Sequence, residues 1–224
     1  MTTVWRWMMT CGSECKICHG AGFIDHGDLG VELCPNDPAK YLDAGVELND
    51  KRIPALLPRN AVRTNIGNAL LNLRKAGSGM LYIQGPFGIG KTVLARAATV
   101  EAVDMFGSAL YRRHSELANY LRASFSNDYG QAELARRIDR FGNVLWLVID
   151  EIGRVNDTDF VRESVGEIVD ARYRNALRGR AMTVLISNDP PESVFDAYLV
   201  DRIRDVKNKV LVLNGESLRK AVRK

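Results

Sequence analysis

The chain has 224 residues, of which 46% are hydrophobic and 26% charged, with a net charge of +4. This composition is ordinary for a globular protein and excludes fibrous and low-complexity classes. The longest unbroken apolar run, Val144–Ile149, is too short to cross a membrane, and the first residues lack the long apolar stretch of a secretory signal. We therefore expect a cytoplasmic protein with no membrane partner, made of one domain and a small appendage.

The appendage covers residues 1–36 and contains all four cysteines. Cys15 and Cys18 form a C-x-x-C turn with trailing glycines, which lets two thiolates face one metal ion. Cys34 supplies a third ligand, and we favour Cys11 as the fourth because four thiolates close a structural Zn²⁺ site. The alternatives for the fourth ligand are His26, His19 and Asp37. A segment with so little core would depend on the metal for its folding, the other interpretation being free thiols in a loose segment.

Residues 37–58 are predicted to be a linker, because prolines recur along them. From residue 59 to residue 224, strand patterns alternate with helix patterns, which is typical of an α/β domain with a parallel sheet. Helices are expected over 60–75, 92–106, 115–125, 131–141, 161–173 and 191–199. Strands are expected over 80–84, 108–112, 144–149, 183–187 and 209–213.

A phosphate-binding loop follows the first of these strands and reads Gly85-Pro86-Phe87-Gly88-Ile89-Gly90-Lys91-Thr92. Its glycines let the backbone turn so that N–H groups face phosphates, and the next helix begins with its positive end toward them. Lys91 adds a positive charge for the β- and γ-phosphates, and the Thr92 hydroxyl can ligate Mg²⁺. The expected ligand is ATP with Mg²⁺. The candidate cofactor-binding residues are Gly85, Gly88, Ile89, Gly90, Lys91, Thr92, Val93 and Asp150.

Polar residues follow two later strands. Asp150 and Glu151 end the apolar run, where an α/β sheet places a Mg²⁺ ligand, so Asp150 is the candidate ligand and Glu151 the general base. Asn188 follows the strand at 183–187 and can orient the attacking water. An acidic cap and an ordinary turn are the structural alternatives for these two positions.

Two arginines, Arg202 and Arg204, lie in the segment Asp201-Arg202-Ile203-Arg204-Asp205. One of them could be an arginine finger, which stabilises charge on the phosphoryl group during transfer. The alternative is surface ion pairing.

The order of these motifs resembles a known family. GPFGIGKT, VIDEIG, the helix with IVDARY, ISND, DRIRD and the ending GESLR look like the ATPase core of DnaC/DnaI-type helicase loaders. The IstB-type transposition ATPases share this core, and both belong to the AAA+ superfamily. The resemblance covers about residues 55–222 and implies a P-loop three-layer sandwich with a central parallel sheet and no helical lid.

The resemblance also implies roles for single residues. Lys91 and Thr92 match Walker A, Asp150 and Glu151 match Walker B, and Asn188 matches sensor 1. Arg202 matches the finger that reaches into a neighbouring subunit, and Arg219 falls where a sensor-2-like arginine could sit. The helices between 115 and 141 correspond to an insert associated with single-stranded DNA.

The function that this resemblance implies is ATP-dependent loading of a hexameric replicative helicase onto single-stranded DNA. Subunits would associate into a ring or spiral, and a phage or other mobile element would be the source. The alternative is an IstB-like ATPase that delivers a transposase to target DNA. A small-molecule kinase and a non-hydrolysing adaptor fit less well, because Asp150 and Glu151 suit the activation of water.

Overall fold

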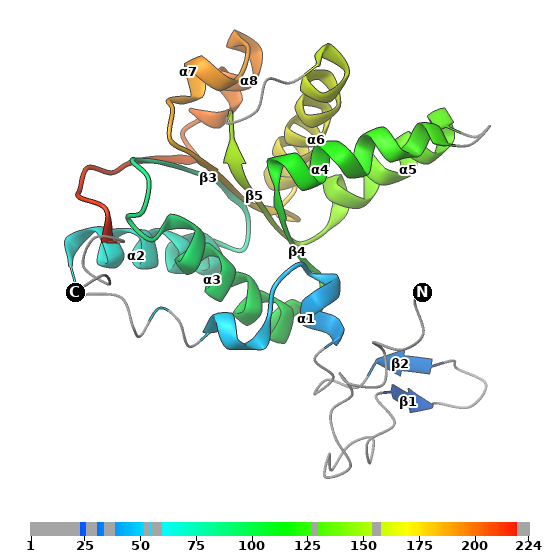
Figure 1. Cartoon of the computed structure of the whole chain (residues 1–224), viewed down its shortest axis with the longest axis horizontal. Coiled ribbons are helices and arrows are strands. Elements are labelled where there is room, and N and C mark those ends of the chain that lie inside the picture. Colours follow the sequence, from blue (N-terminus) through cyan, green and yellow to red (C-terminus); the bar gives the residue numbers. More distant parts are fainter. Residues whose placement is uncertain are drawn as a thin grey trace.

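The computed structural model describes residues 23–25, 31–33, 39–51, 54, 60–126, 130–153 and 158–218. A five-stranded sheet with the order β4-β5-β6-β3-β7 forms its centre, and every strand pairs parallel to its neighbours (Figure 1). The strands are β3 (Gly79–Gln84), β4 (Ala109–Arg113), β5 (Trp146–Ile152), β6 (Met182–Ser187) and β7 (Lys209–Val212). The predicted α/β fold with a central parallel sheet is confirmed.

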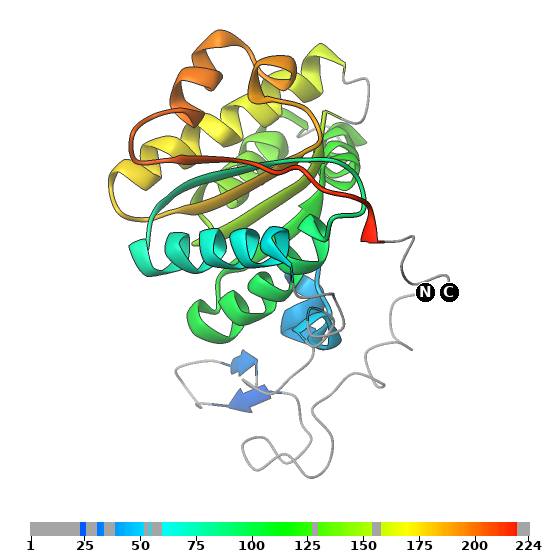
Figure 2. The same ribbon diagram turned by 90° about the vertical axis from the view of Figure 1, so that its left-hand side faces the viewer.

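Helices cover both faces of this sheet (Figure 2). The longer ones are α2 (Ala61–Ala76), α3 (Lys91–Phe106), α4 (His114–Arg122), α5 (Gly130–Asn143) and α6 (Asp159–Leu177). The shorter ones are α1 (Ala39–Asp43), η3 (Leu48–Lys51), η5 (Ala123–Ser126), α7 (Pro191–Val194) and α8 (Ala197–Ile203). Among the described residues, no helix has the length and apolar character needed to cross a membrane.

Alternate residues of the strands divide the interior into two cores. In β5, Trp146 and Val148 pack with α1, α2 and α3, whereas Leu147 and Ile149 pack with α4, α6 and α8. Because both faces of the strand are covered, β5 reads as an unbroken apolar run rather than as an alternating one. The result is three layers: helices, sheet and helices (Figure 2).

The expected elements appear close to their predicted positions, and two of the differences have a clear local cause. The helix expected over 191–199 is divided into α7 and α8, because the Asp196 side chain accepts a hydrogen bond from the Leu199 amide and starts a new helix. The strand expected from residue 144 begins at Trp146, because the Val144 amide still bonds to the Arg140 carbonyl at the end of α5.

Part of the expected linker is folded onto the α/β domain. Residues 39–51 form α1 and η3, and Tyr41, Ala44 and Val46 are buried in the core beside α3. The Ala44 carbonyl accepts a hydrogen bond from the Tyr111 amide of β4, 2.7 Å away. These residues therefore cover the outer edge of β4, the first strand in the sheet order.

In the Cys-rich segment, the described residues form a separate two-stranded antiparallel sheet. Its strands are β1 (Phe23–Asp25) and β2 (Val31–Leu33), with Ile24 opposite Glu32. They lie in sequence between Cys18 and Cys34, where the spacing left room for a hairpin.

One buried arginine joins α6 to the amino ends of β5 and β6. Arg172 is 0% exposed and donates to six acceptors. The acceptors are the Thr183 hydroxyl and the carbonyls of Phe141, Gly142, Val144, Leu145 and Met182. Burial lowers the pKa of Arg172 to about 9, so the group is charged at neutral pH. This contact gives the arginine of the IVDARY helix a structural role.

Candidate functional site

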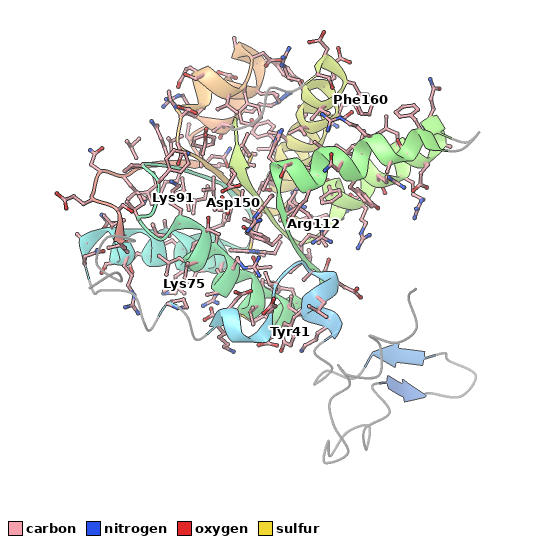
Figure 3. The ribbon with its side chains drawn as sticks, in the orientation of Figure 1. Tyr41, Lys75, Lys91, Arg112, Asp150 and Phe160 are labelled. Atoms are coloured by element: carbon pink, nitrogen blue, oxygen red, sulfur yellow. The ribbon has the colours of Figure 1, made fainter. Side chains whose placement is uncertain are left out.

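A cavity of about 190 Å³ lies at the carboxyl ends of β3, β5 and β6. It brings together Lys91 and Thr92 from the phosphate loop with Asp150, Glu151 and Asn188 from the strand ends. The other lining residues are Phe87, Gly88, Gly90, Val93, Ile186, Ser187 and Leu218. Figure 3 shows Lys91 and Asp150 close to each other beside the sheet.

Lys91 is a buried cation that donates hydrogen bonds to three neutral oxygens. Its Nζ lies 2.5 Å from the Gly85 carbonyl, 2.9 Å from the Pro86 carbonyl and 2.9 Å from Asn188 Oδ1. Burial lowers the pKa of Lys91, while the nearby charges of Asp150 and Glu151 oppose that shift. An anion in the cavity would complement this charge better than the present acceptors do.

Three donors fix the Asp150 carboxylate. Thr92 Oγ1 and the Tyr111 hydroxyl each donate to Oδ2 over 2.7 Å, and the Glu151 amide donates to Oδ1 over 2.8 Å. Asp150 is 1% exposed, so these hydrogen bonds compensate the burial of a carboxylate. A Thr92 hydroxyl that donates to Asp150 turns its lone pairs away from that carboxylate, as a Mg²⁺ ligand needs.

A bulge in β5 places Asp150 and Glu151 beside the same cavity. Ile149 pairs with Leu185 and Ile152 with Ser187, so two residues of β5 face the single residue Ile186 of β6. Glu151 takes a φ of 59°, in the left-handed region that non-glycine residues seldom adopt. Consecutive residues of a regular strand point to opposite faces, and the bulge removes that separation here.

The phosphate loop is closed on one side by the segment at 217–218. The Leu218 amide donates to the Gly88 carbonyl over 2.9 Å, and a Cβ at position 88 would collide with the Ser217 side chain. Gly88 also has a φ of +80°, so a side chain is disfavoured there by both space and backbone conformation. Ile89, expected as a cofactor-binding residue, points its side chain into the hydrophobic core. The backbone of Ile89 is therefore the part that remains a candidate for phosphate contact.

These residues fit the phosphate end of a nucleotide with its Mg²⁺. A buried ammonium group with neutral partners, a hydroxyl bonded to a carboxylate, and the start of α3 all face one small cavity. The cation would be held by Thr92 and Asp150. The phosphates would be held by Gly85, Gly88, Gly90, Lys91, Thr92 and Val93.

Arg202 lies elsewhere and is not among the described residues that line this cavity. Its guanidinium forms an ion pair with Asp170 of α6 and lies over the Tyr198 ring, 3.7 Å from the centroid. The Tyr173 ring is 5.2 Å away, and Arg174 forms a second ion pair with Asp170. We call Asp170, Tyr173, Tyr198 and Arg202 the Arg202 cluster.

Some predicted site residues lie outside the described residues. These are Cys11, Cys15, Cys18, Cys34, His26 and Arg219. Across the ranges that the structure does describe, no group of three or more His, Cys, Asp or Glu side chains is arranged to hold a metal ion. Zinc at the cysteines therefore stays a prediction.

Sequence reasoning missed Tyr111 and Leu218, which contact the site from β4 and from the end of the described chain. Leu218 belongs to the GESLR ending, so that motif was a usable signal. Tyr111 lies in an unremarkable strand pattern, and only the register of β4 beside β5 brings its hydroxyl to Asp150.

Known proteins resemble this chain in sequence and in fold. The ATP-binding protein of the insertion sequence IS1162 from Pseudomonas fluorescens is 28% identical over 151 residues, which are 67% of this chain and 60% of that protein. The chain therefore spans 60% of the length of this relative.

Among solved structures, domain III of the replication initiation protein DnaA from Thermotoga maritima matches with a TM-score of 0.60 and 18% identity. That match covers 79% of this chain and 72% of the other. The DnaC helicase loader matches with a TM-score of 0.52 and 22% identity, over 70% of this chain and 92% of the other. At these identities the likeness concerns the fold alone.

The sequence pattern of one family, described as IstB-like ATP binding protein, matches residues 76–224. The matched region begins at the end of α2 and includes the phosphate loop, β5 and the Arg202 cluster. Since the match extends over more than half of the chain, this protein belongs to the family of IstB-like ATP-binding proteins.

Proposed function

We propose that the chain hydrolyses ATP in order to assemble on DNA and deliver a DNA-acting partner protein there. The observation that supports hydrolysis, beyond binding, is the bulge that places Glu151 beside the cavity with Lys91, Asp150 and Asn188. A carboxylate held there at the cost of a strained backbone suits the activation of water.

In this proposal, the phosphate loop and Lys91 bind the triphosphate. Asp150 and Thr92 would hold Mg²⁺, which would supply positive charge to the phosphates. Glu151 accepts the proton of the attacking water. The Asn188 amide, which contacts Lys91 through Oδ1, orients that water or the γ-phosphate.

Arg202 acts in this proposal on the site of a neighbouring subunit. It does not line the cavity of its own chain, and the Arg202 cluster holds it in a defined position with only 19% of its side chain exposed. The cavity is then one half of a site, and the neighbour supplies the other half. The hydrolysis rate per subunit should accordingly rise with protein concentration.

A mixing experiment tests this shared site. Arg202→Ala should lower assembly-dependent hydrolysis on the order of 100-fold while ATP binding persists. Glu151→Gln should be inactive although its own arginine finger, Arg202, is intact. Mixing the two inactive variants should restore part of the hydrolysis, because the Arg202→Ala site then receives a finger from its neighbour. If the mixture stays inactive although both variants associate, the arginine does not act between subunits.

For the partner, we infer a transposase first. The family is that of IstB-like ATP-binding proteins, and a relative with 28% identity is the ATP-binding protein of an insertion sequence. The DNA contact is assigned to the insert α4–η5–α5, where Arg122, Arg136 and Arg140 are exposed. Phosphate contacts of this kind weaken as salt is raised.

A replicative helicase is the second candidate partner. The cysteine-rich segment over 1–36 favours it, because a small zinc module could grip a helicase while 59–224 acts as the ATPase domain. The linker between them would be 37–58, of which 39–51 lies against that domain.

Pull-downs with the purified chain separate the two partners. Retention of an insertion-sequence transposase, with ATPase stimulation by duplex DNA, supports the first candidate. Retention of a hexameric helicase, with stimulation by single-stranded DNA, supports the second. ATPase activity that neither DNA nor either partner changes would contradict the proposed function.

A further inference from the structure

Tyr111 lies outside every motif named above, yet it contacts the carboxylate of Asp150, the proposed Mg²⁺ ligand. It is 1% exposed in β4, and its hydroxyl donates to Asp150 Oδ2 over 2.7 Å. A tyrosine hydroxyl is a hydrogen-bond donor, so Tyr111 complements the carboxylate that it contacts.

The Tyr111 hydroxyl fixes how the Asp150 carboxylate is turned. Oδ2 accepts from Tyr111 and from Thr92, whereas Oδ1 accepts from the Glu151 amide. Thr92 follows the phosphate loop directly and the Glu151 amide belongs to the bulge of β5, whereas Tyr111 comes from a separate strand, β4. Without it, the carboxylate can rotate away from the direction that a cation requires.

The segment at 39–51 in turn holds Tyr111. The Tyr111 amide donates to the Ala44 carbonyl over 2.7 Å, and a Cβ on Gly45 would collide with the Tyr111 carbonyl. Gly45 has a φ of +82°, so this close approach of two backbones depends on glycine.

A side-chain contact reinforces this backbone contact. The Arg96 guanidinium lies over the Tyr111 ring, 5.0 Å from its centroid. Arg96 also bonds to Asp50 of η3 through Nε and Nη2, at 3.1 and 2.8 Å. Asp50 is itself 7% exposed, and its Oδ2 accepts from the Glu47 amide. A continuous set of contacts thus runs from η3 through Arg96 and Tyr111 to Asp150.

We propose that Tyr111 is a positioning residue for Asp150 and that the segment at 39–51 controls it through Asp50 and Arg96. The proposal rests on the proposed role of Asp150, and the experiment below separates the two.

The test measures the affinity of a fluorescent ATP analogue as Mg²⁺ is titrated into the purified full chain, with an EDTA sample as the metal-free reference. Tyr111→Phe should leave the affinity in EDTA within about twofold. It should raise about tenfold the Mg²⁺ concentration that gives half of the maximal change in affinity. A tenfold change corresponds to the loss of one hydrogen bond to a charged group. Asp50→Asn should shift it in the same direction by about threefold, since it acts through Arg96.

A matched control is Tyr82→Phe. Tyr82 is also a tyrosine of the sheet with 1% exposure, it lies outside 39–51, and its hydroxyl donates to the Asp189 carbonyl over 2.9 Å rather than to Asp150. This variant should leave the Mg²⁺ dependence unchanged. A shift equal to that of Tyr111→Phe would mean that loss of any buried phenol suffices, and the positioning role would be overturned.

Asp150→Asn distinguishes failure of this inference from failure of the proposed function. If Asp150→Asn leaves the Mg²⁺ dependence unchanged, Asp150 does not hold the cation and the proposed role falls with the inference. If Asp150→Asn abolishes the dependence but Tyr111→Phe has no effect, only the positioning role is wrong. If Tyr111→Phe shifts the dependence and Asp50→Asn does not, control by 39–51 is wrong. Should Tyr111→Phe not fold, Arg96→Met replaces it, and an unshifted dependence then overturns the proposal.

Discussion

Lys91 and Arg172 are buried cations at opposite ends of the same sheet. Lys91 lies at the carboxyl ends of the strands, where its three acceptors border a cavity of about 190 Å³. Arg172 lies at the amino ends of β5 and β6, where six acceptors enclose it completely. Burial lowers the pKa of both groups.

The difference between the two lies in what surrounds them. Five of the six acceptors of Arg172 are carbonyls at the end of α5 and at the starts of two strands, and these cannot be exchanged for a ligand. A phosphate could replace the present acceptors of Lys91, because open volume lies beside its ammonium group. Burial of a charge therefore indicates function only where space for a ligand accompanies it.

The largest expected effect belongs to the enclosed cation. Arg172→Met should lower the free energy of unfolding by about 3–5 kcal/mol, because several buried carbonyls lose their donor. Thermal unfolding followed by circular dichroism measures this, and the folded fraction should bind ATP with unchanged affinity. Arg204→Ala is the control, since Arg204 pairs with Glu192 at the surface, and its melting temperature should not change. Equal melting of Arg172→Met and the unmodified chain would remove the distinction between the two cations.

The second effect concerns the cation beside the cavity. Lys91→Ala should weaken ATP binding by at least about 100-fold, because a charge-assisted contact to the phosphates is lost. Without nucleotide, its melting temperature should be the same or higher, since a buried charge has been removed. Calorimetric titration with ATP and a thermal melt measure these two quantities. Unchanged nucleotide affinity would contradict the assignment of the phosphate loop.

The smallest effect concerns Asn188, which follows β6 and accepts a hydrogen bond from Lys91. Asn188→Ala should lower the hydrolysis rate about tenfold and leave ATP affinity within about threefold, because the amide acts on the water or the γ-phosphate. Steady-state phosphate release and nucleotide titration separate the two quantities. A loss confined to affinity would place Asn188 with Lys91 as a binding residue.

Local patterns predicted much of this site. The phosphate loop is contiguous, so eight consecutive residues, including its glycines, Lys91 and Thr92, predict phosphate binding. The apolar run before Asp150 predicted a covered central strand, and the parallel sheet brought that strand end to the cavity. The segment at 39–51 was expected as a linker because prolines flank it, yet its buried side chains meet α3 and β4, which lie far away in sequence.

By itself the sequence determined the α/β fold, the order of its elements and the phosphate-loop motif, because hydrophobic period and loop composition act over a few residues. Only the tertiary structure decided that Asp150 and Glu151 share a cavity, since the bulge depends on how β5 pairs with β6. It also decided the contact of Tyr111 with Asp150, the enclosure of Arg172 and the separation of Arg202 from the cavity. These features join residues that are distant in the chain, and no local period records which partner a side chain meets across a sheet.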